Sequence, residues 1–336
     1  MRAKFIIGIV SVGLVMAIGA AAGIEYRPYE AQHDMAAARA LLASGQYQAA
    51  LSAAEKAAGF GASGAPRLEN AVQAARYLSS ARSLLASNRY AAAIQAAEKA
   101  ATFGQAQTAV QLEHRAQALE TSAQHYALAL QAIQQQQWVT AASELRQVIR
   151  GSPSYVAAQE RLTYIQTTLV ADVQADIASS SYNQALAKVT VLLQIFPGDS
   201  PAQGLKAQVE SGLVAADVQA GDRQLGAGND YAAEDDFNNA LAINPNDAEA
   251  TLDLGLAYYQ SGNVATSITY FQNAAQMLSQ AGDYANESIA DYDLGLAYYN
   301  TNDYPDAATA FQAAVNADPS DTQAQNYLTV LQNAGY

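Results

Sequence analysis

Three glycines form the pattern in the sequence that most resembles a cofactor site. Gly59, Gly61 and Gly64 are spaced as GxGxxG, the arrangement with which dinucleotide-binding turns approach a pyrophosphate. That arrangement works between a strand and a helix, whereas here it follows the alanine-rich segment 49–58 and leads to Pro66. We therefore interpret it as a loop between helices. The sequence contains no P-loop, GxSxG or HExxH motif, so a phosphate cradle, a serine nucleophile and a zincin site lack sequence support.

The histidines and acidic clusters do not predict a metal site. His114 and His125 are 11 residues apart, about three helical turns, and two imidazoles at that separation cannot hold one ion alone. The run 234–236 is acidic, but it lacks the spaced oxygen ligands and the turn glycine of a calcium loop. We interpret it as a solvated acidic face. We expect no catalytic, cofactor-binding or metal-binding residues, and predict that the chain is not an enzyme.

Tyrosine pairs suggest surface contacts instead of chemistry. The sequence has 20 tyrosines, and Tyr258-Tyr259 and Tyr298-Tyr299 are adjacent pairs. On a helix the second residue of each pair points about 100° away from the first, so it leaves the core face. Tyrosine suits interfaces because it combines a large ring with a polar tip. The candidate groove or interface residues are Tyr259, Tyr299, Asp253, Asp291 and Asp293.

Charge is distributed unevenly along the chain. The net charge is −14, and residues 224–336 contain 15 acidic residues and no basic ones. This balance argues against nucleic-acid binding, which requires a basic surface. A protein or peptide that binds residues 224–336 should be neutral or basic. Because there is no cysteine, disulfides, cysteine-ligated zinc and thiol catalysis are excluded.

The first 24 residues have the composition of a membrane-targeting segment. Arg2 and Lys4 precede an uncharged run, residues 5–24, whose 20 residues as a helix would span the ~30 Å hydrocarbon core. Small residues at 20–22 also fit a signal-peptidase site, so residues 1–24 are a transmembrane anchor or a signal peptide. Either would place the rest outside the cytoplasm, anchored through residues 5–24 or released to the cell surface or medium. Residues 25–35 are expected to be a linker.

The remainder of the chain is repetitive. Residues 47–61 and 90–104 are identical at 11 of 15 positions, and the segment 253–259 recurs unchanged at 293–299. In each unit a short turn precedes one large residue, and a small residue usually follows three positions later. Such periods of two helices predict a stack of helix-turn-helix units. The seven large residues are Tyr47, Tyr90, Trp138, Tyr182, Tyr231, Val264 and Tyr304.

The last units resemble the tetratricopeptide repeat. The unit 288–321 has leucine, glycine and tyrosine at spaced positions of its first helix and alanine and phenylalanine on its second, and the preceding unit matches it. The residues that carry the resemblance, and that it places in the repeat core, are Gly255, Tyr258, Phe271, Gly295, Tyr298, Tyr304, Ala307 and Phe311.

The resemblance implies an all-α solenoid of about seven stacked repeats behind an N-terminal hydrophobic helix. Four long, divergent repeats are expected at residues 36–213, three more regular acidic repeats at 214–321, and a capping helix at 322–336. Such arrays usually present a groove that binds a partner's peptide or helix, so the resemblance implies a non-enzymatic interaction scaffold. The targeting segment at residues 1–24 would make this scaffold extracytoplasmic.

An alternative function is a self-assembling subunit of a cell-surface or extracellular filament. Residues 56–161 contain ten basic and six acidic residues, whereas residues 224–336 are strongly acidic. A chain with opposite charges in two segments can associate head to tail, and such contacts continue into a filament unless they close.

Overall fold

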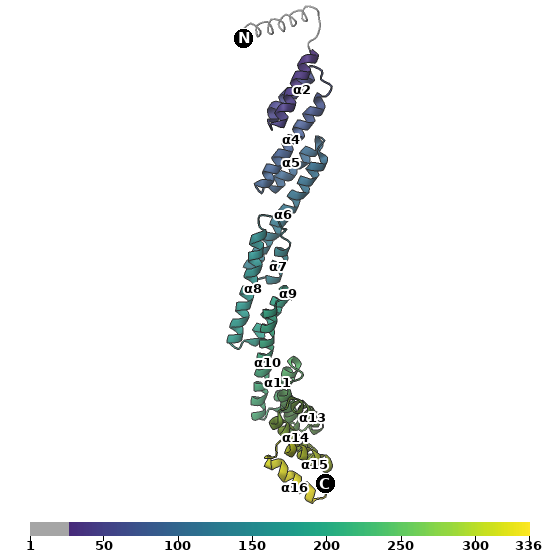
Figure 1. The fold of residues 1–336 in the computed structure, drawn as a ribbon. Coiled ribbons are helices and arrows are strands. Elements are labelled where there is room, and N and C mark those ends of the chain that lie inside the picture. The colour runs from purple at the N-terminus through teal and green to yellow at the C-terminus, as the bar shows by residue number, and fades with distance from the viewer. Residues whose placement is uncertain (1–26) are drawn as a thin grey trace, which may run out of the picture. The chain divides into compact units, whose positions relative to one another are not determined.

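The computed structural model describes residues 27–336, whose regular structure is entirely α-helical (Figure 1). These residues form seven helix pairs followed by a final helix, α16 (Thr322–Asn333). The first helices of the pairs are α2 (Arg27–Ala43), α4 (Ala65–Ala86), α6 (Ala106–Gln134), α8 (Tyr155–Ala178), α10 (Ser200–Gly226), α12 (Ala248–Gln260) and α14 (Tyr284–Asn300). The second helices are α3 (Tyr47–Gly59), α5 (Tyr90–Thr102), α7 (Trp138–Arg146), α9 (Tyr182–Ile195), α11 (Asp230–Ile243), α13 (Val264–Ala281) and α15 (Tyr304–Ala317).

The chain folds as two compact units, one ending at Leu162 and the other beginning at Thr163. In the first unit each helix from α2 to α7 contacts the next, and in the second unit the same holds from α9 to α16. The anchor or signal peptide predicted at residues 1–24 lies outside the described residues. Among the helices of residues 27–336, none combines the length and the apolar composition needed to cross a membrane.

The turn inside each pair has the same backbone geometry. Two residues before each second helix the backbone is left-handed; the residues are Gly45, Asn88, Gln136, Ser180, Gly228, Gly262 and Asn302. The next backbone N–H then bonds to a carbonyl five residues earlier, as Asn263 does to Tyr258 at 2.8 Å. This pattern ends a helix with a left-handed residue and satisfies its last carbonyls. The large residue therefore marks the start of the second helix because the turn has a constant length.

We expect the protein to become more stable when glycine is introduced at the left-handed position of a turn, and less stable when glycine is removed from it. Ser180 has φ 57°, a conformation that costs a residue with a Cβ about 1 kcal/mol, so Ser180→Gly should stabilise the protein by about 1 kcal/mol. Gly262 has φ 88°, so Gly262→Ala should destabilise it by about the same amount. Urea unfolding followed by circular dichroism measures both. If both changes shifted stability in one direction, the left-handed turn would not be the controlling feature.

Close packing between glycine and phenylalanine joins the two helices of the last three pairs. A Cβ built on Gly255 would lie 2.8 Å from the Phe271 ring, and one on Gly295 would lie 2.6 Å from Phe311. Gly221 has the same relation to Phe237, at 2.5 Å. All three phenylalanine side chains are fully buried. The glycine on the first helix of each pair thus lets the phenylalanine ring of the second helix contact the backbone of the first helix.

Several predicted boundaries are wrong. Residues 27–35 are not linker, because α2 begins at Arg27 and buries Ala31 and Met35. The boundary between residues 213 and 214 falls inside α10, so the fifth pair begins at Ser200, where Asp199 caps the helix. In the first five pairs, the first helix (α2, α4, α6, α8 or α10) has 17 to 29 residues. These long helices account for the long periods of the divergent repeats.

In the fifth pair, Asp230, not Tyr231, begins the second helix. Ala233 therefore takes the small buried position and Tyr231 remains 74% exposed.

Candidate interaction surface

First helices of the second unit present acidic and tyrosine side chains side by side. The helix α12 contacts both α10 and α14. Asp253 on α12 and Asp293 on α14 occupy equivalent positions, each two residues before the glycine that meets a phenylalanine. Both carboxylates are half-buried. The repeat itself therefore places one carboxylate on each helix at the same level.

Burial is the main cause that raises the pKa of both carboxylates. Burial, followed by the charges of Asp222, Glu249, Asp247 and Asp293, raises the pKa of Asp253 to about 7. Burial alone raises the pKa of Asp293 to about 6. Neither carboxylate has a hydrogen-bond or ion-pair partner in the part of the chain that the structure describes. The sequence beyond Arg223 contains no lysine or arginine that could neutralise them.

Two tyrosines, Tyr259 and Tyr292, are close enough to Asp293 for its charge to raise their pKa. Burial, and then the charge of Asp293, raise the pKa of Tyr259, and the Asn300 side-chain amide donates a hydrogen bond to the Tyr259 hydroxyl. The ring centroid of Tyr292 lies 6.1 Å from that of Tyr327 on α16. We call the set Asp222, Asp253, Asp293, Tyr259 and Tyr292 the acidic face. A carboxylate beside aromatic rings attracts a cation both by charge and through the ring faces.

The other two predicted interface residues, Tyr299 and Asp291, do not belong to the acidic face. Tyr299 packs edge-on against Tyr304 and Tyr327, with ring centroids 5.4 and 5.6 Å apart, so it joins the last pair to α16. Asp291 is only 8% exposed, and burial followed by the charge of Glu287 raises its pKa to about 6. Two residues along a helix correspond to about 200°, so Asp291 lies on the other side of α14 from Asp293.

The predicted repeat core divides into buried and half-buried positions. Gly255, Phe271, Gly295, Ala307 and Phe311 are buried. The three tyrosines are half-buried: the Tyr258 ring stacks on that of Tyr270 at 5.3 Å, the Tyr298 hydroxyl accepts a hydrogen bond from Gln272 at 2.8 Å, and the Tyr304 hydroxyl donates one to Asn302 at 3.0 Å.

Sequence reasoning missed Asp222 and Tyr292 as members of the acidic face. Asp222 follows Gly221, and aligning that glycine with Gly255 would have identified α10 as the preceding first helix. Five other acidic side chains of this unit instead accept hydrogen bonds from backbone N–H groups at helix starts. These N-caps are Asp199, Asp247, Asp283, Asp303 and Asp321. Part of the negative charge therefore stabilises helix ends and is not available for binding.

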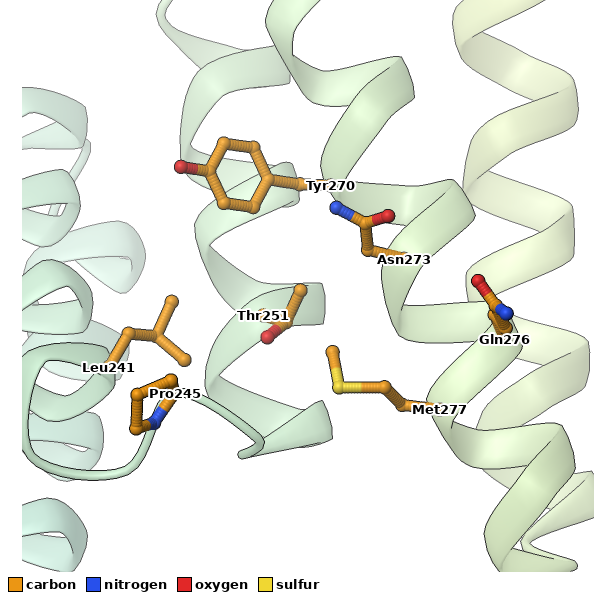
Figure 2. A pocket seen from close by; sticks show the side chains of 7 residues that line it. All are labelled: Leu241, Pro245, Thr251, Tyr270, Asn273, Gln276 and Met277. Atoms are coloured by element: carbon orange, nitrogen blue, oxygen red, sulfur yellow. The ribbon is translucent and has the colours of Figure 1, made fainter.

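A small cavity opens between α11, α12 and α13 (Figure 2). It has a volume of about 260 Å³, and the buried Thr251 hydroxyl, at its centre, donates to the Asp247 carbonyl at 2.6 Å. Its lining is mixed, with Leu241, Pro245 and Met277 apolar and Tyr270, Asn273 and Gln276 polar. Binding sites for small molecules usually measure ~300–1,000 Å³, so this cavity has room for about one side chain.

Within residues 27–336 no three histidine, aspartate or glutamate side chains are placed to hold a metal ion. His125 Nδ1 lies 2.7 Å from Glu144 Oε2 and so links α6 to α7. The segment from Gly59 to Gly64 connects α3 to α4, as expected for a loop between helices.

Comparison with known proteins identifies the regular part of the chain. Residues 247–320 match the family model of the tetratricopeptide repeat. No curated protein matches the chain in sequence. Among solved structures, the TPR domain of P58(IPK) is similar at 13% identity, covering 90% of this chain and 98% of that one with a TM-score of 0.33. The TPR2AB domain of yeast Sti1 in complex with pHSP90 is similar at 12% identity, covering 77% and 97%, with a TM-score of 0.32. The matched residues 247–320 include the helices α12 to α15, in which glycine packs against phenylalanine.

Proposed function

We propose that this protein is a non-enzymatic extracytoplasmic scaffold that binds a basic segment of a partner protein on its acidic face. Tetratricopeptide repeats generally mediate protein–protein interaction, which supports the scaffold part of the proposal. The observation that carries the choice of partner is the group of carboxylates on α10, α12 and α14 with no basic residue after Arg223. A lysine or arginine from the partner would supply the missing charge.

The location outside the cytoplasm rests on the sequence of residues 1–24. A retained anchor would hold the scaffold at the membrane through residues 5–24, and a cleaved signal would release it. Sequencing the N-terminus of the mature protein distinguishes the two. Digestion of the repeats by protease added to intact cells tests the location itself, and protection in intact cells but not in lysed cells would contradict it.

We expect the full-length protein to bind a labelled lysine- and arginine-containing peptide and not a glutamate-containing peptide of equal length. The double variant Asp253→Asn and Asp293→Asn should weaken binding about tenfold, because two carboxylates that face the cation lose their charge. Fluorescence anisotropy in mild detergent measures both affinities.

A matched control variant removes the same number of negative charges outside the acidic face. Asp235 and Asp306 are exposed on second helices, so Asp235→Asn with Asp306→Asn removes two charges without touching the acidic face. Equal weakening by the two double variants would indicate a response to net charge alone and would reject the acidic face as the binding site. Preference for the glutamate peptide would reject the proposed partner class.

Self-assembly is a second candidate function, and one observation favours it. Ten of the 17 basic residues lie within residues 56–161, where they outnumber the acidic ones, while the C-terminal part of the chain is acidic throughout. Two copies could therefore attract each other through different parts of their surfaces.

A further inference from the structure

The N-terminal unit contains a cavity with two arginines at its edge. It has a volume of about 430 Å³ and lies between α4, α6 and the segment that contains Pro153. Arg82 on α4 and Arg115 on α6 are exposed, and within residues 27–336 neither has an ion-pair or hydrogen-bond partner. The volume is within the range of ~300–1,000 Å³ that is usual for binding sites.

Three leucines line the cavity together with the two arginines. Leu85, Leu112 and Leu119 are half-buried. Guanidinium groups favour carboxylates, because their paired N–H donors match the two carboxylate oxygens. A lining of leucines favours an aliphatic or aromatic side chain. The cavity therefore suits a protein surface in which one apolar side chain is flanked by carboxylates.

The second unit carries a surface of this kind at the start of α11. Tyr231 is 74% exposed and has Asp230 beside it and Glu234 and Asp235 one turn further on. One oxygen each of Asp230 and Glu234 is buried without a hydrogen-bond partner in the described part of the chain. This turn thus combines an exposed ring with carboxylates that have no ion-pair partner within residues 27–336. We refer to these four residues as the Tyr231 turn.

We propose that the Arg82–Arg115 cavity of one copy docks the Tyr231 turn of a second copy. The argument is charge complementarity: the cavity lies in the part of the chain with a basic excess, and the turn lies in the part without basic residues. Because the two surfaces differ, each copy can use both at once, and association continues beyond a dimer unless the geometry closes a ring. This inference rests on self-assembly and does not depend on peptide binding by the acidic face.

Sedimentation velocity of the full chain in mild detergent tests the docking. We expect species larger than a monomer at about 0.05 M NaCl, which dissociate at about 0.5 M NaCl because salt screens exposed charges. Arg82→Glu with Arg115→Glu, and separately Tyr231→Ala, should each raise the dissociation constant at least about tenfold. Arg67 and Arg161 are exposed and outside the cavity, so Arg67→Glu with Arg161→Glu makes the same charge change as a control and should leave association intact.

Mixing two defective copies gives the sharper test. The Arg82→Glu and Arg115→Glu copy retains the Tyr231 turn, and the Tyr231→Ala copy retains the cavity. Each should be monomeric alone, and together they should form a dimer and nothing larger, because only one complementary contact remains. A wild-type monomer at both salt concentrations, equal loss of association in the Arg67 and Arg161 control, or no dimer on mixing would overturn the proposal. The basic-peptide affinity of the same variants is measured separately and should be unchanged, so the two proposals fail independently.

Discussion

Replacing Phe271 by alanine should destabilise the C-terminal unit by about 3–5 kcal/mol. The ring is fully buried, and it fills the space above Gly255 where α12 and α13 approach each other. Removing it deletes the buried ring and leaves a cavity between helices whose backbones cannot close completely. Because a stack of repeats can unfold in parts, hydrogen exchange measured by mass spectrometry on peptides from α12 and α13 is the appropriate measurement.

The opposite substitution provides a second measurement at the same contact. Gly255→Ala introduces a Cβ at 2.8 Å from the ring and should cost about 1–3 kcal/mol. Combining it with Phe271→Leu, which removes the aromatic atoms near that Cβ, should cost less than the sum of the two single changes. Tyr284 is 60% exposed, so Tyr284→Ala is a control with little expected effect. Strict additivity at the Gly255–Phe271 pair would contradict the packing described for these helices.

The stability of the C-terminal unit should fall as the pH rises from about 4 to about 7. The pKa of an aspartate in an unfolded chain is ~4, whereas burial and neighbouring carboxylates raise that of Asp253 to about 7 and burial raises that of Asp293 to about 6. Between these values the folded state binds more protons than the unfolded state. Raising the pH through this window therefore favours unfolding.

The variant Asp253→Asn with Asp293→Asn should flatten this dependence. We expect it to exceed the wild type in stability by about 2 kcal/mol at pH 8, after allowing for solvent screening of half-exposed groups, and to equal it near pH 4. Hydrogen exchange of α12 and α14, corrected for the intrinsic effect of pH, measures the difference. Asp235→Asn is the control because that carboxylate is exposed on α11. A wild-type unit that gains stability between pH 4 and 7 would have the opposite linkage and would contradict the arrangement of the acidic face.

The protonation of Asp253 and Asp293 also predicts whether affinity for the partner rises or falls with pH. Below about pH 5 both carboxylates are largely protonated in the free protein, so a basic segment meets less negative charge. A bound cation favours the ionised form and lowers both pKa values, so binding releases protons in this range. Affinity for the basic peptide should accordingly rise with pH, while stability without the peptide falls.

Turn positions were predictable from the sequence because they depend on local chemistry. Six of the seven predicted large residues begin a second helix, since each follows a turn of constant length with a left-handed residue two positions before the helix. Only Tyr231 is displaced, by one position.

Helix lengths were not predictable in the same way. The boundary inside α10 and the helical residues 27–35 show that long alanine- and glutamine-rich helices carry no strong signal where they begin. Their starts depend on single caps such as Asp199 and on which residues find a neighbour to pack against.

By itself the sequence determined that the described chain is built from helical hairpins, where each hairpin turns, and that the negative charge is concentrated after Arg223. These are properties of periodicity, turn chemistry and composition, which act over a few residues at a time. Only the tertiary structure decided which carboxylates share a surface. Asp253 and Asp293 occupy equivalent positions on the neighbouring helices α12 and α14, whereas Asp291, two residues from Asp293, lies on another side of α14. The reason is that residues 40 apart become neighbours only through stacking of repeats, and the angle around the helix then decides which side chains share a surface.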